Sequence, residues 1–227
     1  MNNVHRYWIA SAFALFLVGG GAVGGWLISR STENQGAGTL SPFDHPAFGN
    51  PEVAGKRVVE RIVLEEPESA FNFELINMDG SKMKLEDFSG KLVLLGFIYT
   101  NCPDVCGLLT QHYRYIQRQF AREIGKELEL MFITTDPERD TPRRLTAYTH
   151  GFGGKWLFFT GSVSQLEEVW KNYDIFVTEG KEGTDLVIHS YSVALIDRKG
   201  MIRYRYMGIV DPEEAIVKDI RSLIDDV

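Results

Sequence analysis

Two cysteines, Cys102 and Cys106, offer the most reactive chemistry in this sequence, and they are its only cysteines. They follow the apolar run LVLLGFIYT (92–100), where we expect a buried strand to give way to a helix. Side chains four residues apart on a helix are neighbours, and the helix N-terminus favours the thiolate form. Two thiolates are a soft ligand pair that suits Cu(I) or Zn(II). The same pair could instead close a disulfide after a local adjustment, or be buried thiols with a structural role only.

A third metal ligand would have to come from elsewhere in the chain, and the sequence contains five histidines. His189 is the candidate, because it stands immediately before the apolar run YSVALID (191–197). In a thioredoxin-like fold, the connection before this strand lies close to the cysteine loop. Spacing alone leaves it open whether His189 is a ligand. The other four histidines have plainer interpretations. His5 would belong to a membrane flank and His45 to a tether, whereas His112 would be a packing residue and His150 a helix C-terminal residue.

The pattern of apolar residues from about residue 58 onward predicts an α/β domain. Asp79-Gly80 marks a hairpin turn, and Pro142 and Pro212 mark helix starts. We expect strands over 71–75, 82–88, 92–100, 128–135, 156–161, 191–197 and 201–208. We expect helices from Cys106 to near Gly125, over 142–150, over 164–173 and from Asp211 through Leu223. This order is that of a thioredoxin-like fold with an extra N-terminal β-hairpin.

An apolar segment near the N-terminus predicts a transmembrane helix. Residues 7–28 form a run of 22 residues without a charge, which is long enough to cross a hydrocarbon core of about 30 Å. A cleaved signal peptide normally has an apolar region of only about 7–15 residues. Trp8 and Trp26 stand at the two ends, as in membrane-spanning helices. A buried helix of a globular domain is the alternative; the preferred interpretation makes the lipid bilayer a partner of residues 7–28.

The chain divides into three predicted parts: a membrane anchor over 1–30, a flexible tether over 31–57 and a domain over 58–227. The tether is rich in Gly, Pro, Ser and Asn and has no apolar period. Arg6 before the span favours an N-terminus in the cytoplasm and a domain on the other side. The net charge is −7 without clustered Lys and Arg, which argues against nucleic acid as a partner.

Three motifs occur in order along the predicted domain: GFIYTNCPDVCGLLT (96–110), TTDPERDTPRRL (134–145) and VIHSYSVALID (187–197). Together they resemble the Sco (SenC) family of copper chaperones for cytochrome c oxidase, which have a similar single N-terminal span. The resemblance covers nearly all of residues 70–210. It implies a bound copper ion, Cu(I) or Cu(II), and delivery of that ion to the copper centre of oxidase subunit II or a similar acceptor protein.

The resemblance also implies roles for particular residues. Cys102 and Cys106 match the two thiolate ligands of the family, and His189 matches its imidazole ligand. Asp136 and Asp140 match an acidic loop of the family. These two carboxylates would hold the ligand residues in place without binding the ion, or they would face a partner protein. Capping the following helix is the structural alternative.

Two positions depart from the family pattern. Gly107 stands where the family usually has a proline after the second cysteine. Ile188 stands where the family often has an acidic residue before the histidine, and Asp185 is the nearest carboxylate. Both changes could alter metal affinity or disulfide formation, but neither removes a ligand.

A membrane-anchored thiol–disulfide oxidoreductase, which would reduce the cysteines of the acceptor's copper site, is the main alternative function. The same two cysteines would suffice for it, and His189 would only tune their pKa. A peroxidase related to peroxiredoxins fits less well, because Tyr99 stands where the Thr-x-x-Cys pattern needs threonine. The family resemblance implies an inner (cytoplasmic) membrane location, with the domain on the periplasmic or outer side.

Overall fold

The computed structural model describes residues 60–103, 105–180, 186–208 and 213–226. The predicted span over 7–28 and the predicted tether over 31–57 lie outside these ranges. Within them, no helix combines the length and the apolar character that crossing a bilayer requires.

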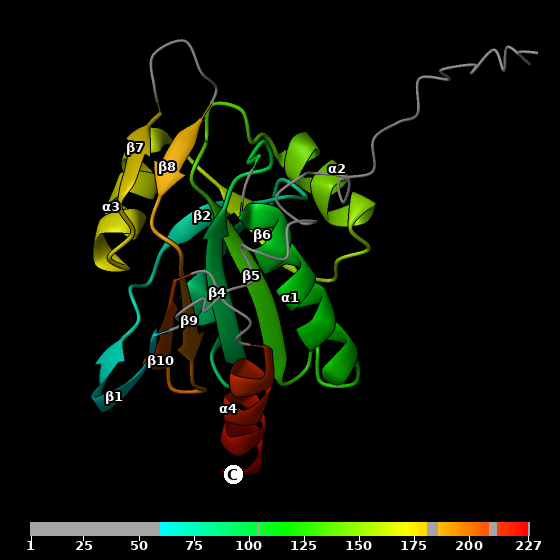
Figure 1. Ribbon diagram of the computed structural model, residues 1–227, viewed down its shortest axis with the longest axis vertical. Helices are drawn as coiled ribbons and strands as arrows, with labels where there is room; N and C mark the ends of the chain where they lie inside the picture. The colour runs from blue at the N-terminus through cyan, green and yellow to red at the C-terminus, as the bar shows by residue number, and fades with distance from the viewer. Residues whose placement is uncertain (1–59, 104, 181–185, 209–212, 227) are drawn as a thin grey trace, which may run out of the picture. The chain divides into compact units, whose positions relative to one another are not determined.

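Ten strands and four α-helices are found in the described part of the chain (Figure 1). The strands are β1 (Glu60–Ser69), β2 (Glu74–Asn77), β3 (Lys82–Lys84), β4 (Leu92–Ile98), β5 (Leu128–Thr134), β6 (Leu157–Thr160), β7 (Val177–Glu179), β8 (Val187–His189), β9 (Ser192–Ile196) and β10 (Met201–Met207). The helices are α1 (Cys106–Gln119), α2 (Pro142–Gly151), α3 (Val163–Asn172) and α4 (Glu213–Asp225), with a short 3-10 helix η2 (Leu85–Phe88).

Eight of these strands form one mixed sheet in the order β1-β10-β9-β4-β5-β6-β2-β3. The central strands β4, β5 and β6 are parallel, whereas β9, β10 and β1 continue the sheet antiparallel on one side. Because β4 and β5 are parallel, their carboxyl ends meet at one edge of the sheet, where α/β folds carry their sites. β7 and β8 form a separate two-stranded ribbon.

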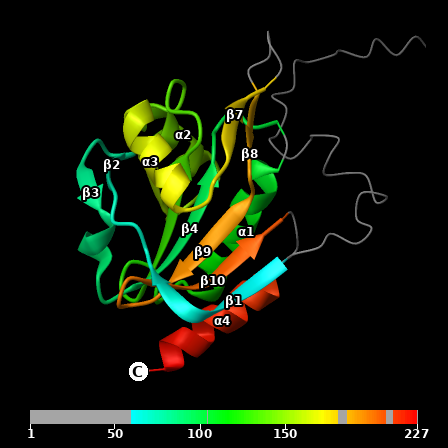
Figure 2. The ribbon, with the colours of Figure 1, turned by 90° about the vertical axis from the view of Figure 1, so that its left-hand side faces the viewer.

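Helices cover both faces of the central sheet (Figure 2). The side chains of β4 alternate between the two apolar layers, so that Leu94 packs under α1 and α4 and Leu95 packs on the side of α3 and η2. All seven residues of β4 are buried, as its continuous apolar run predicts. The centre of the sheet is therefore a rigid base for the loops at its carboxyl edge.

Close packing of α1 on the sheet depends on Gly96 in β4. A Cβ atom at this position would lie 2.8 Å from the Tyr113 hydroxyl oxygen and 3.1 Å from the Phe132 ring. Tyr113 instead donates a hydrogen bond to the Leu94 carbonyl oxygen at 3.2 Å and stacks on Phe132 with ring centroids 4.0 Å apart. This packing fixes the helix that begins at Cys106.

The predicted central strands, the C-terminal hairpin and the N-terminal hairpin are confirmed, with shifted ends. The N-terminal hairpin pairs 74–77 with 82–84 rather than 71–75 with 82–88, because 85–88 turn into η2. The predicted start of the last helix at Asp211 lies outside the described residues. The structure adds three strands that the sequence pattern did not predict, β1, β7 and β8.

The prediction that α1 runs to near Gly125 is wrong. The helix ends at Gln119, because Phe120 leaves the helical region with φ −119° and ψ 36°. The apolar period continues past the helix end because Phe120 is buried and Ile124 packs against the core from a turn rather than from a helix. Gly125 follows with a positive φ of 82° and completes that turn.

A buried carboxylate joins α4 to the neighbouring strands β1 and β10 at one edge of the sheet. Asp219, with 5% of its side chain exposed, accepts two hydrogen bonds from Arg61 at 2.7 and 2.6 Å. The Tyr206 hydroxyl donates a third at 2.7 Å. The carboxylate therefore joins α4, β1 and β10 at one point.

We expect Asp219→Ala to lower the free energy of unfolding by about 2–3 kcal/mol, because the buried Tyr206 hydroxyl and the half-exposed Arg61 guanidinium lose their acceptor. Urea unfolding followed by circular dichroism measures the change. Asp225→Ala, which removes an exposed carboxylate from the same helix, is the control and should change the free energy by less than about 0.5 kcal/mol. Equal effects of the two variants would show that Asp219 does not fasten the helix.

Candidate metal centre

Cys106 and His189 come together at the carboxyl edge of the sheet, although 83 positions separate them in the chain. Cys106 is the first residue of α1 and is 1% exposed, and His189 is the last residue of β8. The Cys106 Sγ atom lies 3.6 Å from His189 Nε2. The structure thus brings together two of the three predicted ligands.

A backbone carbonyl orients the imidazole of His189. Its Nδ1 atom lies 3.0 Å from the Ser190 carbonyl oxygen, which can only accept a hydrogen bond. This contact assigns the ring proton to Nδ1 and leaves the Nε2 lone pair directed towards Cys106. A neutral imidazole held in this way is the form that binds a metal ion.

Cys102 lies in the loop before α1 and is partly exposed. Burial raises the pKa of the nearby Tyr99 to about 12, and the neighbouring side chains of Cys102 and Cys106 add to this rise. No disulfide joins Cys102 and Cys106 in this structure. Among the residues that the structure describes, no three His, Cys, Asp or Glu side chains are gathered closely enough to hold a metal ion as they stand. The structure therefore shows the contact between Cys106 and His189, and Cys102 as the third ligand stays a prediction.

The donor set fits a soft metal ion. Two sulfur atoms and one imidazole nitrogen favour Cu(I), whereas the oxygen donors that Mg²⁺ and Ca²⁺ require are not part of the set. Cys106 stands at the N-terminus of α1, whose dipole favours a thiolate there. The residues present are therefore suited to copper in its reduced state.

Asp140 fixes the chain just before Cys102. It is fully buried, and its carboxylate accepts hydrogen bonds from the Thr100 hydroxyl at 2.5 Å, the Thr100 N–H at 3.1 Å and the Thr134 hydroxyl at 2.6 Å. Burial raises the pKa of Asp140, and the hydrogen bonds from Thr100 and Thr134 oppose that rise. The carboxylate ties the carboxyl ends of β4 and β5 together directly beneath the cysteine loop.

Arg144 on α2 extends this network to the surface. Its Nε atom donates to the Thr100 hydroxyl at 2.7 Å and lies 3.9 Å from Asp140, and its Nη2 atom donates to the Asn101 side chain at 3.3 Å. No local sequence signal connects Arg144 with Thr100, because the contact spans 44 positions. Sequence reasoning therefore missed both residues.

The two acidic residues named by the family resemblance are both buried. Asp136 is 5% exposed and pairs with Arg139 at 2.5 Å, and Asp140 has no exposed surface. Burial argues against contact of either carboxylate with a partner, and it is Asp140 that reaches the cysteine loop, through its hydrogen bonds with Thr100. Neither caps α2: the N-cap is Thr141, whose hydroxyl accepts a hydrogen bond from the Arg144 N–H at 3.4 Å.

We expect Asp140→Ala to destabilise the domain by about 3 kcal/mol, because the part-buried Thr100 N–H and the buried Thr134 hydroxyl lose their acceptor at once. Chemical unfolding in urea gives the change in free energy. Glu138→Ala, an exposed position in the same loop, is the matched control and should be nearly neutral. A stability loss for Asp140→Ala no larger than the control's would refute the role of this network.

The two family departures are chain neighbours of Cys106 and His189, whereas the other described histidines lie on the helices α1 and α2. His112 is a buried residue of α1, and His150 is exposed in the last turn of α2, as predicted, whereas His5 and His45 fall outside the described residues. Gly107 is the second residue of α1. Ile188 is 55% exposed, and strand alternation directs it away from the face that carries His189. Asp185 is also outside the described residues.

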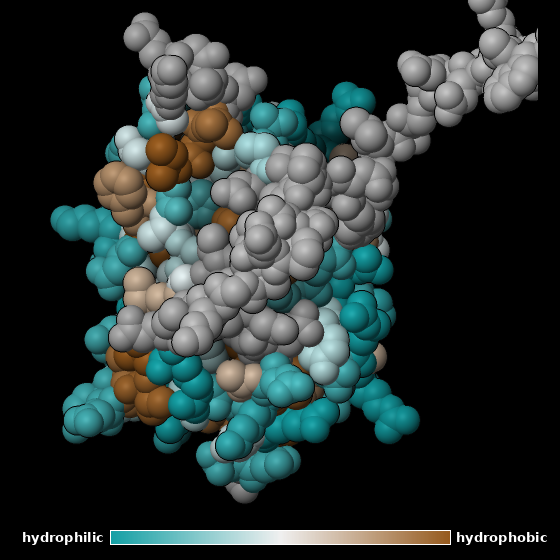
Figure 3. Space-filling view, viewed as in Figure 1, coloured by the Kyte–Doolittle hydropathy of each residue, from teal (hydrophilic) through white to brown (hydrophobic). Residues whose placement is uncertain are grey.

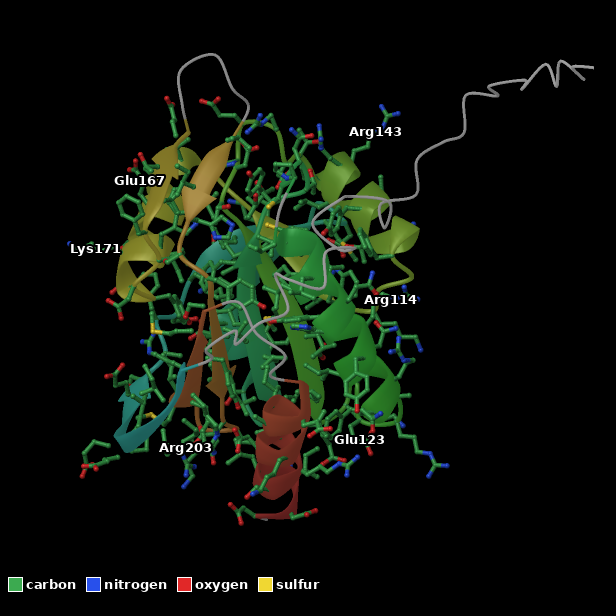
Figure 4. The ribbon with its side chains drawn as sticks, in the orientation of Figure 1. Arg114, Glu123, Arg143, Glu167, Lys171 and Arg203 are labelled. Atoms are coloured by element: carbon green, nitrogen blue, oxygen red, sulfur yellow. The ribbon has the colours of Figure 1, made fainter. Side chains whose placement is uncertain are left out.

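The surface beside the site is apolar on one side and basic on the other. Phe176, Leu186 and Ile188 on and beside the β7–β8 ribbon are 63%, 40% and 55% exposed, and Figure 3 shows hydrophobic side chains gathered there. The helices α1 and α2 carry four arginines and no acidic residue. Figure 4 shows Arg114 and Arg143 on this side, with Glu167 of α3 on the opposite side. The site therefore lies between two unlike surfaces.

Comparison with known proteins identifies relatives over most of the described domain. Residues 64–225 match the family model described as SCO1/SenC. The SCO1 protein homolog of Bacillus subtilis strain 168 is 30% identical over 155 residues, which make up 66% of this chain and 80% of that protein.

Solved structures agree in fold. The crystal structure of yeast Sco1 with copper bound has a TM-score of 0.61 and 27% identity, covering 71% of this chain and 91% of that one. A second structure is that of BsSco, described as a member of the Sco family of cytochrome c oxidase assembly proteins with a disulfide switch. It has a TM-score of 0.60 and 28% identity, and the match covers 72% of this chain and 99% of that one. With its thioredoxin-like fold, its two cysteines and its oriented histidine, this chain belongs to the SCO1/SenC family.

Proposed function

We propose that the protein is a copper metallochaperone that binds copper through Cys102, Cys106 and His189 and delivers it to the copper centre of cytochrome c oxidase. The observation that carries this proposal is the 3.6 Å contact between Cys106 Sγ and His189 Nε2, with the imidazole oriented by Ser190. The copper bound to yeast Sco1 and the oxidase assembly role named for BsSco support it.

The unequal exposure of the ligands suggests an order for copper transfer. Cys106 is buried and His189 is held by a backbone carbonyl, whereas Cys102 is partly exposed in a loop. An incoming acceptor thiolate can therefore displace Cys102 first, and Cys106 and His189 release the ion afterwards. A site with three ligands leaves room for this exchange, because the acceptor ligand can bind before a donor ligand leaves.

We further propose that residues 7–28 anchor the chain in the inner membrane with the domain on the periplasmic or outer side. The support is the uncharged run of 22 residues with Trp8 and Trp26 at its ends. Copper delivery to subunit II, or to a similar acceptor protein, would then occur at the membrane surface. Protease protection of the chain in inverted and right-side-out vesicles tests the orientation.

Copper binding and transfer by the full chain in detergent test the proposed function. Titration with Cu(I) against a chromophoric chelator should show about one tightly bound ion per chain. The loaded chain should then pass its copper to a metal-free acceptor domain from oxidase subunit II faster than the chelator-bound ion does. Absence of tight binding, or transfer no faster than from the chelator, would refute the proposal.

A thiol–disulfide oxidoreductase is the second candidate function. The contact of Cys106 with His189 favours it, because a neighbouring imidazole can take the proton from a thiol. A disulfide switch is also named for the relative BsSco. The two functions separate at His189, which copper binding needs and thiol–disulfide exchange does not.

A further inference from the structure

Tyr99 contacts both ligand-bearing segments of the proposed site. It follows β4 directly, is 2% exposed and precedes Cys102 by three positions. Its hydroxyl lies beside the side chains of Cys102 and Cys106 and accepts a hydrogen bond from the Val187 N–H at 3.2 Å. Its ring meets the His189 ring edge to face, with centroids 5.9 Å apart and planes at 77°.

The bond to Val187 matters because of where that N–H points. The hydrogen bonds at the two ends of the β7–β8 ribbon set its alternation. The Leu186 carbonyl oxygen accepts from the Gly180 N–H, and the Ser190 N–H donates to the Phe176 carbonyl oxygen. Alternation along an antiparallel strand therefore turns the N–H of Val187, which pairs with Glu179, away from β7 and towards the domain. The Tyr99 hydroxyl supplies the acceptor on that side. A single oxygen atom thus holds β8 two residues before His189.

We propose that Tyr99 is a positioning residue of the metal site, whose hydroxyl couples the cysteine loop to the strand that carries His189. The inference rests on the proposed function and adds a residue to it. In the metal-free protein the hydroxyl lies beside the side chains of both cysteines and holds β8 through the Val187 N–H. When copper binds, the same bond keeps His189 in place.

A purely structural Tyr99 would act through its ring alone, and phenylalanine would then replace it without consequence. The ring fills the same volume in Tyr99→Phe, so the fold should be retained. Tyr191 offers a matched control beside the same site. Its hydroxyl is buried, and no residue that the structure describes hydrogen-bonds with it. Tyr191→Phe therefore removes a neighbouring buried hydroxyl without breaking a bond.

The test compares the full chain in detergent micelles as wild type, Tyr99→Phe and Tyr191→Phe. In the metal-free proteins, amide hydrogen exchange at Val187 should become about tenfold faster in Tyr99→Phe and stay within about twofold in Tyr191→Phe. The dissociation constant for Cu(I) should rise about tenfold in Tyr99→Phe alone. The NMR signals of the His189 ring should also shift only in Tyr99→Phe.

Unchanged exchange at Val187 in Tyr99→Phe, or equal effects of the two substitutions, would overturn the inference. Faster exchange with unchanged copper affinity would also overturn it, because the hydroxyl would then hold the strand without acting on the site. If the wild type binds no copper, the proposed function fails by itself. The exchange at Val187 and the His189 signals of the metal-free proteins still decide whether Tyr99 couples the two segments.

Discussion

Replacing both cysteines by serine should abolish tight copper binding, from about one ion per chain to no measurable stoichiometric binding. Cys102 and Cys106 are the only cysteines in the sequence, so no other thiolate can take their place. Serine preserves the size of the side chain but is a hard, neutral donor that Cu(I) does not favour. Chelator competition with Cu(I) on the full chain measures the change.

The single substitutions extend this expectation. Cys106→Ser should weaken binding more than Cys102→Ser, because Cys106 already lies 3.6 Å from the His189 nitrogen. Circular dichroism spectra serve as the control for folding, since Cys106 is buried. Full copper stoichiometry in the double variant would exclude the cysteines as ligands and with them the proposed site.

His189→Ala should weaken Cu(I) binding by about 100-fold while leaving thiol–disulfide exchange within about threefold of the wild type. The reason is that the imidazole supplies one of three metal donors but neither of the sulfur atoms that exchange electrons. Copper competition measures the first quantity, and the rate of reduction of a small disulfide measures the second.

His150→Ala is the control for this comparison, because His150 is an exposed residue at the end of α2. It should leave both quantities unchanged. If His189→Ala kept tight copper binding but slowed disulfide exchange strongly, the imidazole would serve thiol chemistry, and the oxidoreductase function would be the better account.

Most of the central sheet could be predicted from the sequence, because its strands are continuous apolar runs buried on both faces. The missed strands lack such a pattern. β1 contains Glu65, Glu66 and Pro67, and its register shifts between Val63 and Glu68. Such an edge strand is held by pairing with β10 rather than by its own sequence. β7 and β8 have three residues each, too few for a period to appear.

The residues of the site could likewise be predicted from the sequence only in part. The two cysteines could be predicted from their spacing at a strand–helix junction, since that geometry is local. His189 needed the family resemblance, because 83 positions separate it from Cys106. Asp140, Arg144 and Tyr99 act through contacts between distant segments, and no local pattern encodes such contacts.

The coordination of copper in the wild-type chain tests the central claim most directly. X-ray absorption at the copper edge of the full chain loaded with one equivalent of Cu(I) reports which atoms bind the ion. We predict two sulfur scatterers and one imidazole nitrogen, with the nitrogen contribution absent in His189→Ala. A spectrum without sulfur, or an unchanged nitrogen contribution in His189→Ala, would contradict a site built from Cys102, Cys106 and His189.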